Sequence, residues 1–314
     1  DGSTVPNVRV IDRAEVPSAP YKPNKRRMII VAGLVGLFVG IGLAFFRERL
    51  DNTFRTPATM EEKLGISSLG VVPLITNEHV PEREVLENPR SLFTENINHI
   101  RTGLLFSNID NPPQMIAITS ASSSEGKTTL SANLAAAFAQ LDRTLLIEVD
   151  LRKPVLARRL GIASVPGITD LVAGQVEREQ CLHQVSEKSP LFVISCGAML
   201  PNPLEFLSSA RFAETLAELR EHFTYIVLDG PPALAVSDAA VIGHLADAVI
   251  LAVKAESTTH KMSQEAVSRL NRATVRITGG VLCQADIERM AEYGGGYYYA
   301  DNYSHDAASD RETA

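Results

Sequence analysis

The sequence contains a loop whose residue types and spacing suit the phosphates of a nucleotide. An apolar run, Met115–Thr119, leads directly into Ala121-x-x-x-x-Gly126-Lys127-Thr128, and a helix-forming stretch follows. This is the spacing of a P-loop, with alanine where glycine usually stands first. Small residues let backbone N–H groups curl around a phosphate, and the helix beginning near Lys127 points its positive end at that phosphate. We expect Lys127 to reach the β- and γ-phosphates and Thr128 to offer its hydroxyl to Mg²⁺.

The loop therefore predicts binding of ATP together with Mg²⁺. The residues expected to contact the nucleotide are Ser122, Ser123, Ser124, Glu125, Gly126, Lys127, Thr128 and Thr129. A small-residue turn that carries Gly-Lys-Thr by chance is the alternative, and two further segments argue against it.

Acidic residues follow two other apolar runs. Tyr225–Leu228 ends at Asp229, which fits a carboxylate near Mg²⁺, although an aspartate that caps a turn would look the same. The run 144–149 carries Glu148 and is followed by Asp150 and Arg152. Ligands bind at the carboxyl ends of strands in parallel sheets, so the loop and both acidic segments are expected at one edge.

The elements that must position these residues alternate between strands and helices from Ser91 to about Met290. The expected strands are Met115–Thr119, Thr144–Val149, Leu191–Ser195, Tyr225–Leu228, Ala248–Val253 and Gly280–Cys283, with a short extra strand within Gly70–Ile75. The expected helices include Thr128–Gln140, Pro203–His222 and Lys261–Arg272. Continuous apolar strands separated by helices predict an α/β fold with a mostly parallel sheet covered by helices on both faces.

An uncharged stretch of 19 residues, Met28–Phe46, precedes this region. As a helix it would be about 28 Å long, which is close to the thickness of a bilayer's hydrocarbon core. Lys25, Arg26 and Arg27 bound one end, and arginines bound the other. These features favour one transmembrane helix over a buried core helix or a secretory signal peptide. The denser basic cluster would place the N-terminal side in the cytoplasm, but a nucleotide site requires the opposite orientation.

Composition limits the remaining possibilities. The net charge of −7 and a pI near 5.6 argue against a protein that mainly binds nucleic acid. The three cysteines are far apart and offer neither a disulfide framework nor a zinc site. Because the chain opens with Asp1 rather than methionine, we expect a fragment of a longer protein.

The C-terminal segment concentrates tyrosine, since five of the seven tyrosines lie in the last 22 residues, beside three glycines. This segment has too little apolar material to fold alone. The expected organisation is a proline-rich extracytoplasmic segment, a membrane helix, a juxtamembrane linker, a nucleotide-binding domain and a flexible tail, at 1–27, 28–46, 47–90, 91–290 and 291–314.

Together these residues resemble the bacterial tyrosine kinases that accompany capsule and exopolysaccharide assembly. In that family Ala121–Thr128 looks like Walker A, Leu145–Arg152 like Walker A′ and Ile226–Pro232 like Walker B. The resemblance covers nearly the whole chain and extends to Pro201-Asn202-Pro203 and the tyrosine-rich tail. It implies an ATP-dependent autokinase of the bacterial inner membrane with a cytoplasmic kinase domain.

The resemblance also implies roles for single residues. Lys127 would stabilise the transferring phosphoryl group, Glu148 would act as the base for the phenol, and Asp150 would join Thr128 and Asp229 near the metal. Arg152 would be either a phosphate contact or a salt-bridge partner. The acceptors would be Tyr293, Tyr297, Tyr298, Tyr299 and Tyr303 of a neighbouring subunit in a homo-oligomeric ring. The implied partners are a phosphotyrosine phosphatase and the polysaccharide polymerase and export machinery.

Three positions depart from the family pattern. Glu148 stands where the first Walker A′ acid is usually aspartate, and the ring motif Glu-x-x-Arg-x-x-Arg appears as Glu95-x-x-Asn98-x-x-Arg101. The expected oligomer contacts are therefore Glu95 and Arg101, with one cation lost. Cys283 replaces an asparagine that is frequent at the expected adenine end of the site, so base recognition is expected to differ.

Two other functions fit parts of the sequence. A membrane-associated ATPase of the partitioning or division-site type would share the fold, but it would typically carry a second lysine early in the P-loop, which Ala121–Glu125 lacks. A nucleotide-binding scaffold without turnover would be compatible with Glu148 and Asn98.

Overall fold

The computed structural model describes residues 22–50, 52–75 and 80–291, and the chain divides into two units, 1–51 and 52–314. Within the first unit, α1 spans Lys25–Leu50. Its segment Lys25–Leu43 is long and apolar enough to cross a membrane, and none of it is buried within the structure. An apolar helix of a soluble core would be mostly buried, so this exposure favours the predicted span.

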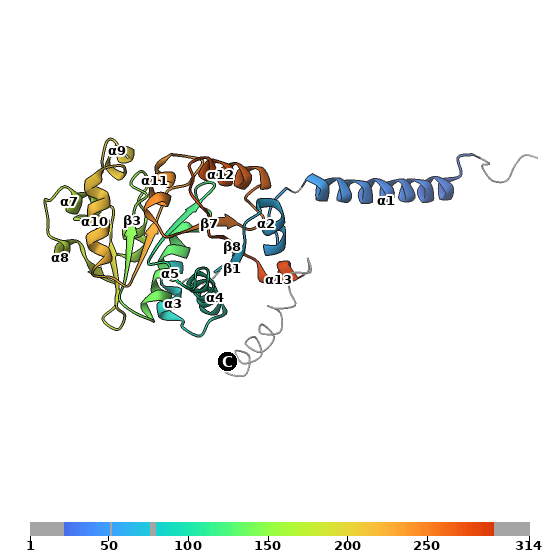
Figure 1. Cartoon of the computed structure of the whole chain (residues 1–314). Coiled ribbons are helices and arrows are strands. Elements are labelled where there is room, and N and C mark those ends of the chain that lie inside the picture. Colours follow the sequence, from blue (N-terminus) through green and yellow to red (C-terminus); the bar gives the residue numbers. More distant parts are fainter. Residues whose placement is uncertain (1–21, 51, 76–79, 292–314) are drawn as a thin grey trace, which may run out of the picture. The chain divides into compact units, whose positions relative to one another are not determined.

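An eight-stranded sheet forms the centre of the second unit (Figure 1). Its strands lie in the order β1-β8-β7-β2-β6-β3-β5-β4, and every neighbouring pair is parallel except β4 and β5. The strands are β1 (Ser68–Pro73), β2 (Met115–Ser120), β3 (Thr144–Glu148), β4 (His183–Gln184), β5 (Leu191–Ile194), β6 (Tyr225–Asp229), β7 (Ala248–Lys254) and β8 (Gly279–Ala285). The predicted fold class is confirmed.

The central strands are mostly apolar because both faces of the sheet are covered. In β2, Met115 and Ala117 contribute to one hydrophobic core, while Ile116 and Ile118 contribute to the other. Successive side chains of a strand point to opposite faces, so a strand buried on both sides shows no polar alternation.

Helices cover the two faces (Figure 1). The face that carries Ile116 and Ile118 packs against α3 (Glu84–Glu87), α4 (Leu92–Phe106), α5 (Lys127–Ala139) and α6 (Leu156–Leu160). The face that carries Met115 and Ala117 packs against α2 (Pro57–Leu64), α7 (Ile168–Val172), α8 (Arg178–Cys181), α10 (Ala210–Arg220), α11 (Asp238–Leu245) and α12 (His260–Arg272). The remaining elements of the described residues are short: η1 (Pro81–Arg83), α9 (Pro203–Leu207) and α13 (Ile287–Met290).

The sequence predicted one helix over 203–222, but the structure has two, α9 and α10. The break falls at Ser208 and Ser209, and the hydroxyl of Ser209 accepts a hydrogen bond from the backbone N–H of Phe212 at 3.2 Å. A serine in this position satisfies an unpaired N–H at a helix start, so it begins a new helix rather than continuing the old one. The two-residue strand β4 was not predicted.

Much of the segment expected as a juxtamembrane linker, 47–90, is folded into the second unit. Strand β1 pairs with β8 in parallel, and α2 buries Met60 and Leu64. Further on, the side-chain amide of Asn133 in α5 donates to the carbonyl of Pro81, and its oxygen accepts the N–H of Val85. Residues 57–73 and 81–87 therefore belong to the body that carries the nucleotide loop.

Candidate active site

The loop between β2 and α5 is shaped to receive an anion. Ser124 and Gly126 have positive φ angles of 66° and 90°, and α5 begins at the next residue. Alternation of right- and left-handed backbone turns successive N–H groups into a concave nest. At Gly126 a side chain would also crowd the wall of the site, since its Cβ would lie 3.1 Å from the Cβ of Cys283. Ser123 and Ser124 are exposed at the mouth of the loop.

Lys127 opens α5 and is 8% exposed. Its ammonium group lies close enough to Asp150 and Asp229 to favour the charged form of both carboxyls, which lowers their pKa values against the effect of burial. The lysine therefore stands at the junction of the loop with the two acidic segments, as the sequence predicted.

Asp229 ends β6 and is almost fully buried. Burial raises the pKa of its carboxyl to about 7, while Lys127 and hydrogen bonds from Thr128 and Ser131 oppose the rise. The Ser131 hydroxyl donates to the carboxylate at 3.0 Å. A buried carboxylate that is costly to ionise and sits beside a threonine hydroxyl fits a divalent cation, whose charge would offset the burial.

The described residues include no cluster of three or more His, Cys, Asp or Glu side chains that could hold a metal alone. Mg²⁺ usually keeps waters and substrate phosphates as ligands and takes only one or two groups from the protein. Thr128 and Asp229 are therefore a donor pair that fits Mg²⁺ brought with a nucleotide, and Asp150 lies near the same Lys127 charge. Asp150 is partly exposed, and burial raises the pKa of its carboxyl.

Glu148 lies beside Asp229 in the register of β3 and β6, but its carboxylate faces the protein. One oxygen accepts the N–H groups of Val155 and Leu156, both at 2.6 Å, and the other accepts the N–H of Cys196 at 3.3 Å. The residue is 1% exposed. Glu148 therefore caps the start of α6 and ties it to the end of β5, with both oxygens already engaged.

Arg152 turns to Asp238 at the start of α11. Its Nε and Nη2 atoms donate to the two carboxylate oxygens at 2.8 and 3.1 Å, so the contact is bidentate. Asp238 is almost fully buried, whereas Arg152 remains 41% exposed at its side chain. Of the two roles expected for Arg152, the structure contains the salt bridge.

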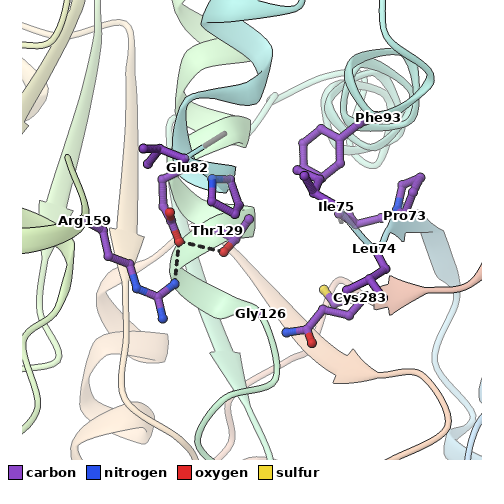
Figure 2. A pocket seen from close by; sticks show the side chains of 13 residues that line it. Pro73, Leu74, Ile75, Glu82, Phe93, Gly126, Thr129, Arg159 and Cys283 are labelled. Carbon is purple, nitrogen blue, oxygen red and sulfur yellow. Dashed lines mark hydrogen bonds and ion pairs between the residues drawn. The ribbon is translucent and has the colours of Figure 1, made fainter. Parts of the chain in front are cut away.

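A cavity of about 520 Å³ opens beside Gly126 and Thr129 (Figure 2). Glu82 lies on one side of it between Arg159 and Thr129: its carboxylate accepts the Thr129 hydroxyl at 2.8 Å and pairs with Arg159. The opposite side is apolar and includes Pro73, Leu74, Ile75, Phe93 and Cys283. Burial raises the pKa of the Cys283 thiol to about 12, so that wall is uncharged.

The structure thus brings Lys127, Thr128, Asp150 and Asp229 together at the carboxyl ends of β2, β3 and β6. No local sequence pattern marked Glu82, Arg159 or Phe93 as residues of this site. Glu82 is 47 positions from Thr129 and 77 from Arg159, and no local pattern links residues so far apart.

The expected oligomer contacts, Glu95 and Arg101, lie on α4. Glu95 is exposed, whereas Arg101 is half-buried and donates to the carbonyl of Ala137 and, at 3.2 Å, to the side chain of Gln140. The expected acceptors, Tyr293, Tyr297, Tyr298, Tyr299 and Tyr303, lie outside the described residues.

Comparisons with known proteins converge on one family. Residues 113–278 match a family model described as an AAA domain, and residues 1–49 match one described as "G-rich domain on putative tyrosine kinase". The tyrosine-protein kinase wzc of Salmonella typhi is 30% identical over 98% of this chain, and the chain spans 44% of that relative's length.

Two solved structures resemble the second unit. The kinase domain of the Escherichia coli tyrosine kinase ETK has a TM-score of 0.66 and 29% identity, covering 71% of this chain and 92% of that one. The VpsO kinase domain is 40% identical with a TM-score of 0.56, covering 60% of this chain and 93% of that one.

Proposed function

The chain belongs to the family of bacterial tyrosine kinases that accompany capsule and exopolysaccharide assembly, and from that membership we propose that it phosphorylates its own C-terminal tyrosines with ATP. The observation that carries the proposal is the meeting of Lys127, Thr128, Asp150 and Asp229 beside an anion-shaped loop. The acceptors proposed are Tyr293, Tyr297, Tyr298, Tyr299 and Tyr303 of a neighbouring subunit.

The cavity beside Gly126 and Thr129 is proposed to hold the adenosine of ATP. Its volume of about 520 Å³ lies within the usual range for small-molecule sites, roughly 300–1,000 Å³. The apolar side with Phe93 suits the face of a purine, and the side with Glu82 and Arg159 suits ribose hydroxyls. Thr129 follows the loop directly, so a nucleotide with its phosphates at the loop would extend into this cavity.

The proposed reaction is an in-line transfer of the γ-phosphoryl group. The bond from the γ-phosphorus to the oxygen shared with the β-phosphate breaks, a bond to the phenol oxygen forms, and ADP leaves. Lys127 neutralises charge on the phosphates, and Thr128 and Asp229 hold Mg²⁺, which supplies further charge neutralisation. The phenol proton passes to a carboxylate of the Walker A′ segment.

We assign that proton to Asp150 rather than to Glu148. Glu148 is 1% exposed and its oxygens accept three backbone N–H groups, whereas Asp150 is partly exposed. A general base must come within hydrogen-bond reach of the proton that it removes. Glu148 then positions the segment from which Asp150 projects.

The wider setting follows from the family and from α1. We propose attachment to the bacterial inner membrane through the α1 segment, with residues 52–314 in the cytoplasm where ATP is available. A homo-oligomeric ring with Glu95 at subunit contacts, a phosphotyrosine phosphatase and the polysaccharide export machinery are the proposed partners. Because the Arg101 side chain already donates hydrogen bonds to Ala137 and Gln140 of its own subunit, we propose that it contributes less than Glu95 to subunit contacts.

The test is mass spectrometry of the tail peptide after the purified chain has been incubated with Mg-ATP, for the wild type and for Lys127→Met. Phosphate on residues 293–303 in the wild type alone is the expected result. ATP hydrolysis with an unmodified tail would favour the partitioning-type ATPase instead. Nucleotide binding without hydrolysis or phosphorylation would favour the nucleotide-binding scaffold.

A further inference from the structure

A buried carboxylate lies inside the loop that is proposed to receive the phosphates. Glu125 precedes Gly126 directly and is 3% exposed. An ionised carboxylate there would repel phosphates, and burial of an unpaired charge is costly. The Glu125 carboxylate therefore requires hydrogen-bond donors that compensate its charge and hold it away from the ligand.

Both oxygens of Glu125 have hydrogen-bond donors. One accepts the backbone N–H of Ser122 at 2.9 Å, and the other accepts the hydroxyl of Thr258. The first bond closes the loop on itself across three residues. The second joins the loop to the turn after β7, 133 positions away.

The Thr258 hydroxyl is itself fixed in orientation. Its oxygen accepts the backbone N–H of Lys254 at 3.2 Å, so its proton is free to be directed at Glu125. The N–H of Thr258 donates back to the carbonyl of Lys254 at 3.1 Å, which closes the turn. Thr258 is 4% exposed, so water does not compete for these contacts.

Residues 52–54 hold this turn from its other side. The N–H of Glu256 donates to the carbonyl of Phe54 at 2.9 Å, and the N–H of His260 donates to the carbonyl of Asn52 at 2.7 Å. The rings of Phe54 and His260 lie 4.6 Å apart, and Phe54 is fully buried. The 254–260 turn is therefore clamped by the residues that directly precede α2.

We propose that Glu125 and Thr258 are positioning residues for the phosphate-binding loop: the clamped 254–260 turn holds Thr258, Thr258 holds the Glu125 carboxylate, and Glu125 fixes the curvature of the loop through Ser122. The N–H of Ser122 is thereby engaged by Glu125 and does not bind a phosphate. The N–H groups nearer α5 would bind the phosphates instead. This inference rests on the proposed nucleotide site and identifies two residues that set the shape of its phosphate-binding loop.

The test is the affinity of the full-length chain for Mg-ADP, measured by titration calorimetry, for Thr258→Val, Thr258→Ser and Thr215→Val. Thr258→Val keeps the volume and removes the hydroxyl, so we expect affinity to fall about tenfold, as loss of a hydrogen bond to a charged group would produce. Thr258→Ser restores the hydroxyl and is expected within about twofold of the wild type. Thr215 is partly exposed on α10, where its hydroxyl donates only to the carbonyl of Arg211 in the same helix, and Thr215→Val is expected to leave the affinity for Mg-ADP unchanged.

Unchanged affinity in folded Thr258→Val would overturn the proposal. If that variant does not fold, Glu125→Gln provides the second measurement, because its amide cannot accept both bonds and should weaken binding severalfold. A wild type that binds Mg-ADP but does not phosphorylate its tail would refute the kinase function and leave this proposal standing.

The clamp has its own test in a double-mutant cycle. His260→Ala removes the ring that packs on Phe54 and the contact of its Nε2 atom with the Thr53 carbonyl at 3.0 Å. We expect it to weaken Mg-ADP binding a few-fold in the wild type and to add nothing in Thr258→Val. Additive effects of the two changes would overturn the role given to the turn.

Discussion

At the scale of single residues, the two acids of the Walker A′ segment have different surroundings despite lying two positions apart. Glu148 binds three backbone N–H groups inside the protein, and Asp150 faces the site with an N–H of Lys153 at 3.2 Å. The longer side chain of glutamate reaches the start of α6, where a negative charge is favourable. Its substitution for aspartate is thus explained by a structural contact.

Asp150→Asn and Glu148→Gln should therefore fail in different ways. Asp150→Asn is expected to reduce tail phosphorylation by about 100-fold or more, the usual value of a general base, without lowering the melting temperature. Glu148→Gln should cost about 1–3 kcal/mol of unfolding free energy, because its amide group would face the N–H of Cys196 as a second donor. Phosphorylation assays and urea unfolding of both variants separate the two; equal losses of stability would contradict the division of roles.

The raised pKa of Asp229 predicts a pH dependence of stability in the nucleotide-free protein. The carboxyl has a pKa of about 7 when folded against an ordinary value of 3.8, so the folded state binds more protons between these values. Its contribution to stability is therefore lost as pH rises toward and through 7. Asp229→Asn should melt several degrees above the wild type at pH 8 and close to it at pH 4, near the ordinary pKa of the carboxyl. Asp110→Asn, at an exposed site, is the control and should follow the wild type at both pH values.

At the scale of elements, the junction of β2 with α5 depends on a residue without a side chain. Gly126→Ala combines a left-handed backbone with a close approach to Cys283, whereas Gly161, at φ +67° after α6, has open space around it. Gly161→Ala thus isolates the backbone penalty, about 1–2 kcal/mol. We expect Gly126→Ala to lose more stability than Gly161→Ala. We also expect its affinity for Mg-ADP, measured by calorimetry, to fall more than tenfold. Equal effects of the two alanines would mean that contact with Cys283 is unimportant.

The strands and the phosphate loop could be predicted from the sequence because their signals are local. A fully buried strand such as β2 is a continuous apolar run, and the loop's small residues and lysine fall within eight positions. The break between α9 and α10 was missed because apolar spacing continues across it. The roles of Glu148 and Glu82 were not predictable, since each depends on partners brought together by the folded sheet.

At the scale of the whole molecule, the division of the chain after residue 51 separates an apolar helix from a body with its own core. We expect a chain shortened to begin at Asn52 to remain in the soluble fraction and to bind Mg-ADP with the affinity of the full chain. The full chain should require detergent for extraction from membranes. Fractionation by centrifugation with calorimetry measures both, and an insoluble shortened chain would contradict the autonomy of the second unit.

The clamp on the 254–260 turn has a mechanical consequence. Asn52 is two positions beyond the end of α1, and its carbonyl makes the bond to His260 that comes first along the chain in the second unit. Any tension transmitted along the chain from α1 would load this bond and then the Phe54–Glu256 bond, ahead of the pairing of β1 with β8. The support of the phosphate loop would therefore yield first under load. Tension applied through α1 would weaken nucleotide binding before it unfolded the second unit.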